Sequence, residues 1–138
     1  MLKIKILFIL FIPFMAFAQQ KKDILGNWKV DNITFQLEDS LLQQAQINEL
    51  EKKYENYYLE QEKNTTFSFL KNDSVYIKNE DIQKGTFSIE EAKIIILASE
   101  NTTKSIYYTS IISPIYIELK TTTDKVSYSI FLKKITTQ

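Results

Sequence analysis

The side chains that perform most enzyme chemistry are scarce in this chain. It contains no His and no Cys, and all 17 of its basic residues are lysines. The usual zinc and haem ligands, the thiolate nucleophile, the imidazole base and the guanidinium clamp are therefore missing. We predict no metal site and no cofactor.

Two pairs of adjacent carboxylates remain as candidates for acid and base chemistry. They are Glu80-Asp81 and Glu90-Glu91, and each pair lies in or beside an expected turn, where acidic side chains are usually solvated. General acid and base catalysis by carboxyl groups needs two of them held apart across a substrate and tuned by burial. Neither pair fits that requirement, so we predict that the protein is not an enzyme.

Tyrosine is the other side chain that could make specific contacts, and three of the eight tyrosines fall close together at Tyr54, Tyr57 and Tyr58. They could line the mouth of a cavity, where an aromatic ring with a hydroxyl group suits an amphipathic ligand. They could also form the half-exposed edge of a packed helix. The helical spacing favours the second interpretation.

Short runs of alternating polar and apolar residues, separated by polar turns, predict eight strands. In the last strand, for example, Val126, Tyr128, Ile130 and Leu132 share one face. The expected strands are residues 27–35, 65–70, 74–78, 84–89, 93–99, 103–112, 115–120 and 125–133. The later connections are too short for crossover helices, so neighbouring strands must be antiparallel. The fold class is mainly β: an eight-stranded antiparallel up-and-down barrel, in which closure removes exposed edges.

One segment between the first two strands, residues 40–62, has a different pattern. It has no Gly or Pro, and Ile47, Leu50, Tyr54 and Tyr57 follow the spacing of a helix face. Ser40 and Gln43 form an expected capping box at its start. We predict one long helix of roughly 35 Å, at 1.5 Å per residue, inserted between strands one and two. It could cross one end of the barrel or lie along its wall.

The fifth and sixth strands have apolar residues on both faces, as in residues 94–97 and 106–112. A barrel wall needs apolar side chains only on its inner face, so something must cover the outside of these strands. The candidates are the inserted helix or a second copy of the protein. A helix that covered this wall could not also serve as a lid.

The ends and the charge indicate where the chain acts. Residues 1–18 combine Lys3 and Lys5, an apolar run and an Ala-Phe-Ala cleavage site, which predicts a signal peptide cut before Gln19. Residues 19–138 form one expected domain, secreted or periplasmic, without stable membrane insertion after cleavage. Basic and acidic residues balance at 17 each and are interspersed, so no nucleic-acid partner is expected.

The segment LGNWKV at residues 25–30 holds Gly26 and the sole Trp, Trp28, at the entry to the first strand, and KGTFSI follows at residues 84–89. With the strand count, the helical insertion and the leader, this pattern resembles the lipocalin and calycin group, in particular bacterial lipocalin-like domains. The resemblance implies that Trp28 packs across the closed end of the barrel. It also implies a basic side chain above the indole, either Lys133, our first choice, or Lys134.

We therefore predict an exported lipocalin-like protein that binds a small hydrophobic or amphipathic molecule without catalysis. The alternation along the strands predicts these pocket residues: Phe67, Phe69, Phe87, Ile89, Ile117, Tyr128 and Ile130. The alternative is a barrel filled by its own side chains that acts as a protein-interaction or inhibitor module in the cell envelope. Its partner would be a second copy or an envelope protein.

Overall fold

The computed structural model describes residues 21–98, 104–123 and 125–136. The predicted signal peptide, residues 1–18, lies outside this range, as do the predicted strand ends at residues 99 and 103. No helix in the described part of the chain is both long enough and apolar enough to cross a membrane.

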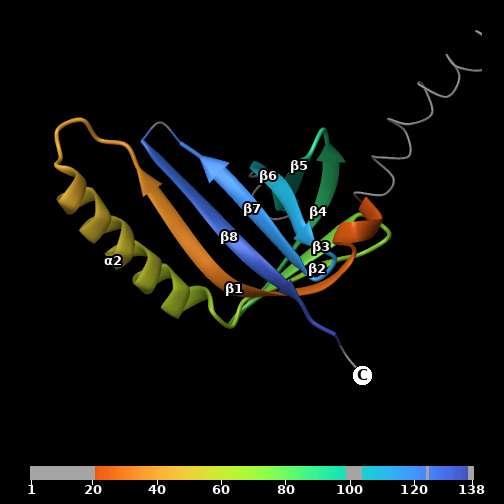
Figure 1. Cartoon of the computed structure of the whole chain (residues 1–138). Helices are drawn as coiled ribbons and strands as arrows, with labels where there is room; N and C mark the ends of the chain where they lie inside the picture. The colour runs from red at the N-terminus through yellow and green to blue at the C-terminus, as the bar shows by residue number, and fades with distance from the viewer. Residues whose placement is uncertain (1–20, 99–103, 124, 137–138) are drawn as a thin grey trace, which may run out of the picture.

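Eight antiparallel strands form a closed barrel in which every strand pairs with its neighbours in sequence and β1 also pairs with β8 (Figure 1). The strands are β1 (Gly26–Leu37), β2 (Thr66–Phe69), β3 (Ser74–Lys78), β4 (Ile82–Glu90), β5 (Lys93–Ala98), β6 (Lys104–Ser113), β7 (Tyr116–Thr122) and β8 (Val126–Lys134). One helix, α2 (Gln44–Glu62), lies between β1 and β2 in the chain. The predicted up-and-down barrel with a helical insertion is confirmed.

The longest contact in the barrel joins β1 to β8, and its register explains which side chains face inward. Phe35 lies opposite Tyr128 and Ile33 opposite Ile130, whereas Val30 lies opposite Leu132. The register shifts between Val30 and Asn32, because β1 has one extra residue there. Such a bulge keeps the apolar side chains on both sides of it facing the interior.

The interior is filled at the end of the barrel where β1 begins and β2 ends. Trp28 has no exposed surface, and Phe69 retains 1% of its surface and Phe87 4%. The rings of Phe69 and Phe87 pack edge to face with centroids 5.1 Å apart. We call this end the closed end and the opposite one, where β1 ends and β8 begins, the open end.

The helix begins later than the sequence predicts. The expected capping box at Ser40 and Gln43 is wrong, because the Asp39 carboxylate and carbonyl accept the backbone N–H groups of Leu41 and Leu42 and hold a turn there. The helix starts at Gln44 instead, and the Gln43 N–H donates to Gln46 Oε1 over 3.0 Å.

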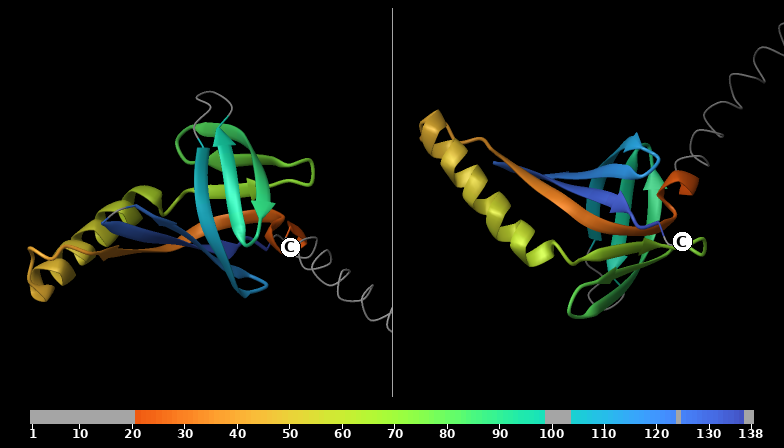
Figure 2. Two further views of the ribbon diagram at one scale, coloured as in Figure 1. Left: turned by 90° about the horizontal axis from the view of Figure 1, so that it is seen from above. Right: turned by 60° about the horizontal axis from the view of Figure 1, so that its bottom comes forward.

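The helix lies along the C-terminal half of β1, away from β4 and β5 (Figure 2). The Phe35 N–H donates to Glu55 Oε1 and the Leu37 N–H to Glu51 Oε2, each over 3.0 Å. The Phe35 ring also contacts Tyr58, with centroids 5.2 Å apart. The helix therefore does not cover the outside of β5 and β6. Of the two coverings that the sequence predicted for this wall, the helix is wrong.

Candidate ligand cavity

A cavity of about 760 Å³ occupies the open end of the barrel. Its apolar lining comes from the interior faces of four strands and consists of Ile33, Phe35, Phe67, Ile77, Val126 and Ile130. Its polar lining consists of Tyr58, Glu62, Thr65, Asn79, Glu80, Asp81, Gln83, Tyr107 and Tyr128. Apolar walls with a limited number of polar groups are typical of sites for small molecules.

The cavity exists because β2 is much shorter than β1. β2 pairs only with Gly26 to Lys29 of β1, so the rest of β1 has β8 on one side and no strand on the other. The helix takes the place of a strand along this free edge. Tyr58 and Glu62, from its last turns, reach the cavity and form one side of its mouth.

Three of the predicted pocket residues, Phe67, Tyr128 and Ile130, line this cavity. Phe69, Phe87 and Ile117 also face the interior, but they belong to the packed core, with exposed fractions of 1%, 4% and 0%.

Ile89, the last of the predicted set, is half-buried near the closed end beside Glu90. Alternation along a strand tells which face a residue occupies, but it does not tell how far along the barrel axis the residue lies.

Sequence reasoning missed Ile33, Phe35, Ile77, Tyr107 and Glu62 as lining residues. Ile33 and Phe35 alternate on β1, and that period-two pattern was a usable signal. Tyr107 was hidden because Ile106 and Tyr108 give β6 apolar side chains on both faces. Only the pairing of Tyr107 with buried Ile94 shows which face of β6 is internal.

The tyrosines Tyr107 and Tyr128 bring two hydroxyl groups, which can form hydrogen bonds, to the lining of the cavity. The side chains of Tyr107 and Tyr128 are hydrogen-bonded to each other. Burial, together with the neighbouring Tyr128 hydroxyl, raises the pKa of Tyr107 to about 12. Burial also raises the pKa of Tyr128. Both groups are therefore neutral at pH 7 and offer a donor and acceptors to a ligand.

The helix tyrosines divide between the two predicted roles. Tyr58 lines the cavity, whereas Tyr54 packs beside Phe35 with ring centroids 6.0 Å apart. Tyr57 is 57% exposed and contacts Tyr58 edge to face. The preferred interpretation, a half-exposed edge of a packed helix, holds for Tyr54 and Tyr57, and Tyr58 serves the cavity.

Three carboxylates lie at the cavity. Glu62 is half-buried and accepts a hydrogen bond from Thr65 Oγ1 over 2.6 Å. Glu80 and Asp81 are exposed at the rim, at the turn between β3 and β4. Among the described residues, no group of three or more acidic side chains is arranged to hold a metal ion.

Trp28 forms the floor of the closed end. Its Nε1–H donates to the carbonyl oxygen of Ile24 over 2.7 Å, and Lys134 Nζ lies 5.6 Å from the indole ring. Lys134 is the cross-strand partner of Trp28 and faces the same side, whereas Lys133 is exposed on the other face. Of the two lysines that the sequence left open, Lys134 thus covers the indole, and the choice of Lys133 does not agree with this geometry.

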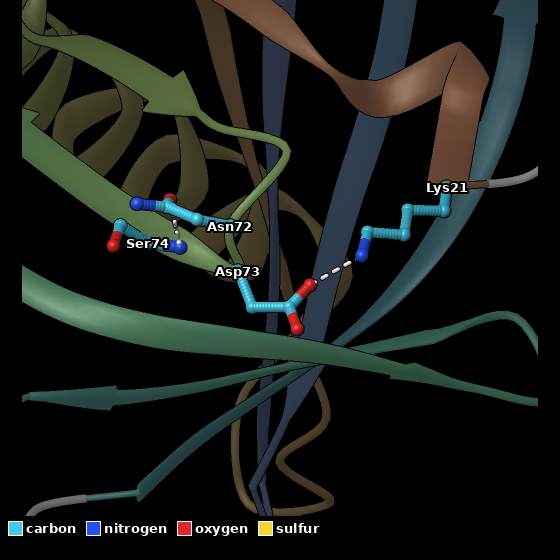
Figure 3. Close-up of polar contacts among 4 residues, drawn as sticks. All are labelled: Lys21, Asn72, Asp73 and Ser74. Atoms are coloured by element: carbon cyan, nitrogen blue, oxygen red, sulfur yellow. Dashed lines mark hydrogen bonds and ion pairs between the residues drawn. The ribbon is translucent and has the colours of Figure 1, made fainter.

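Gly26 allows the chain to turn beneath this floor. Its φ is 129°, a conformation that residues with a Cβ rarely adopt, and a Cβ there would lie 3.2 Å from Lys134 Cε. Residues 21–24, which precede Gly26, form one helical turn. An ion pair joins Lys21 of this segment to Asp73, in the connection between β2 and β3 (Figure 3). In the same turn Asn72 Oδ1 accepts the Ser74 N–H over 3.1 Å.

A comparison with known protein families, curated proteins and solved structures finds no match to this chain.

Proposed function

We propose that this protein is an exported, lipocalin-like binding protein that holds a small amphipathic molecule in the open end of its barrel, without catalysis. The observation that supports this most is the cavity of about 760 Å³. Ligand sites in proteins commonly measure roughly 300 to 1,000 Å³. The apolar depth of this one suits a hydrocarbon or ring system, and the paired hydroxyl groups of Tyr107 and Tyr128 suit one polar end.

The division of the barrel interior also supports a binding role. Large side chains fill the closed end completely, with Trp28, Phe69 and Leu132 at 0%, 1% and 0% exposure. The open end is hollow and is bordered by a helix in place of a strand. A barrel that served only as a rigid interaction module would have no need of such a hollow, because small barrels can be filled by their own side chains.

A second candidate function rests on the outer wall of β5 and β6. Leu97, Ile106 and Tyr108 point outward there with exposed fractions of 42%, 44% and 52%. An exposed apolar patch on a sheet favours contact with another protein. The two functions are compatible, because the patch and the cavity lie on opposite faces of β6.

The test is a variant that fills the cavity without changing the outer surface. Ile130→Trp adds volume inside the cavity, whereas Ile106→Trp makes the same change on the outer face of β6. We expect the neutral hydrophobic probe N-phenylnaphthylamine to bind to the unchanged chain and to the Ile106 variant, with at least a tenfold weaker affinity for the Ile130 variant. Circular dichroism checks that both variants are folded. Equal binding by all three proteins would refute the cavity as the binding site.

Native mass spectrometry of residues 19–138, purified from the host without detergent, is the companion measurement. A bound mass that denaturation releases would identify the class of ligand. A bare mass, together with no probe binding, would favour the interaction module on the β5 and β6 wall.

A further inference from the structure

The charges at the cavity restrict which amphipathic molecule it can hold. Of the described residues that line it, Glu62, Glu80 and Asp81 are acidic, and none is a lysine. The chain as a whole is balanced, with 17 basic and 17 acidic residues, so this imbalance is local. A ligand carboxylate or phosphate would meet like charges here without a compensating cation, and like charges in a partly buried site repel strongly.

Glu62 is the carboxylate placed deepest. It is half-buried, and its charge lies close enough to Tyr107 and Tyr128 to raise the pKa of both hydroxyl groups, although burial is the larger cause. It accepts a hydrogen bond from the neutral hydroxyl of Thr65 over 2.6 Å. By contrast, Glu60 on the opposite side of the helix is 74% exposed and forms an ion pair with Lys63.

Aromatic rings surround the same part of the cavity. Phe35 stacks on Tyr128 with centroids 5.6 Å apart and contacts Tyr58 at 5.2 Å. All three side chains line the cavity together with Glu62. Aromatic rings attract cations through their quadrupole, and rings beside a carboxylate are a recurrent means of recognising an ammonium group.

We propose that the cavity selects an amphiphile whose polar end is a positively charged amine or quaternary ammonium group, with Glu62, Tyr58 and Tyr128 contacting that group and the apolar lining holding its hydrocarbon part. This proposal deepens the proposed binding function and rests on it. The shared chemistry is an alkyl chain that ends in an ammonium group. A free alkylamine and an alkyltrimethylammonium compound both have this chemistry.

The experiment compares three head groups on the same hydrocarbon chain at pH 7. Decyltrimethylammonium, decanol and decanoate, each below its micelle concentration, compete with N-phenylnaphthylamine for the full mature chain, residues 19–138. We expect the cation to displace the probe at about one tenth of the concentration that decanoate needs, with decanol between them, as an ion pair in a partly desolvated site predicts. Decanoyl lysophosphatidylcholine, whose phosphate would meet the same carboxylates, should compete more weakly than the cation.

Glu62→Gln tests which group sets the preference. The glutamine carbonyl can still accept the Thr65 hydroxyl, so the fold should persist, while the advantage of the cation over decanoate should fall about tenfold. Glu60→Gln removes the same charge from the exposed side of the helix and is the matched control, for which we expect the advantage to remain.

The outcomes separate the two proposals. If no head group displaces the probe, or the probe does not bind, the cavity is not a binding site and the proposed function fails. If decanoate or decanol competes as well as the cation, the cavity binds amphiphiles but the ammonium proposal is wrong. An equal loss of selectivity in the Glu60 and Glu62 variants would also overturn the role of Glu62, because overall charge would then explain the preference.

Discussion

Replacing Tyr107 by phenylalanine should make the protein less sensitive to alkaline pH. An exposed tyrosine in an unfolded chain has a pKa of about 10, whereas burial, aided by the neighbouring Tyr128 hydroxyl, raises the pKa of Tyr107 to about 12. Between these two values the unfolded chain has lost this proton and the folded protein has kept it. The free energy of unfolding must then fall as the pH rises, by about 1.4 kcal/mol per pH unit. The loss attributable to Tyr107 is about 2 kcal/mol between pH 10 and pH 12.

The assay is urea denaturation followed by far-ultraviolet circular dichroism at several pH values from 8 to 12. Tyr107→Phe removes the hydroxyl and its titration, so its stability relative to the unchanged protein should improve by about 2 kcal/mol from pH 8 to pH 12. Any constant cost of losing the hydrogen bond to Tyr128 cancels in that difference. Tyr108→Phe, the same change on the outer face of β6, is the control. A pH dependence that is identical in the unchanged protein and the Tyr107 variant would refute the buried, neutral hydroxyl.

Two further substitutions test the closed end and the strand packing. Phe69→Ala should reduce the free energy of unfolding by about 3–5 kcal/mol, since it leaves a void in a fully packed core; probe binding by the folded fraction should persist, and its loss would place Phe69 at the ligand. Gly85→Ala should cost about 1–3 kcal/mol, because its Cβ would lie only 2.5 Å from the backbone oxygen of Leu97 and force β4 away from β5. An unchanged urea midpoint for the Gly85 variant would show that the two strands are not so close.

The barrel was predictable because its strands alternate and its connections are short. Val126 to Lys134 shows why: with Tyr128, Ile130 and Leu132 on one face, the pleat requires that all three point to the same side of the sheet. The same alternation selected every predicted pocket residue, because each lies on the apolar face of its expected strand. It could not separate Phe67, which lines the cavity, from Phe69, which is two residues further along and belongs to the core.

The position along the barrel axis depends on pairings between distant residues. Lys134 faces the indole because it is the partner of Trp28 across β1 and β8, a register that includes the bulge between Val30 and Asn32. The extra residue on β1 keeps Trp28 and Val30 on the interior face together with Ile33 and Phe35, so Trp28 meets Lys134 there. No local pattern in the sequence marks that bulge, although the alternation of β8 alone already places Lys134, and not Lys133, on the face of Ile130 and Leu132.

The inserted helix shows a different limit of pattern reasoning. The apolar spacing of Ile47, Leu50, Tyr54 and Tyr57 predicted the face that would pack on the barrel, yet Tyr57 is 57% exposed. Tyr54 and Tyr58 pack on Phe35 of β1, and the acids Glu51 and Glu55 accept its backbone N–H groups. Sequence rules for helix faces assume an apolar surface opposite, and that assumption fails here.

The reason is that this helix packs on the edge of a strand. In the C-terminal half of β1, the backbone N–H groups that point away from β8 have no neighbouring strand to accept a hydrogen bond. A buried N–H group without an acceptor destabilises the fold. Glu51 and Glu55 supply the acceptors at 3.0 Å, and the same stripe of the helix, at spacings of three and four residues, continues through Tyr58 to Glu62. One helix face therefore replaces a β-strand along its first half and brings a carboxylate to the cavity along its second. Because this helix, and not a strand, borders the open end, the carboxylate of Glu62 on its β1-facing side lines the cavity and makes the proposed binding site acidic.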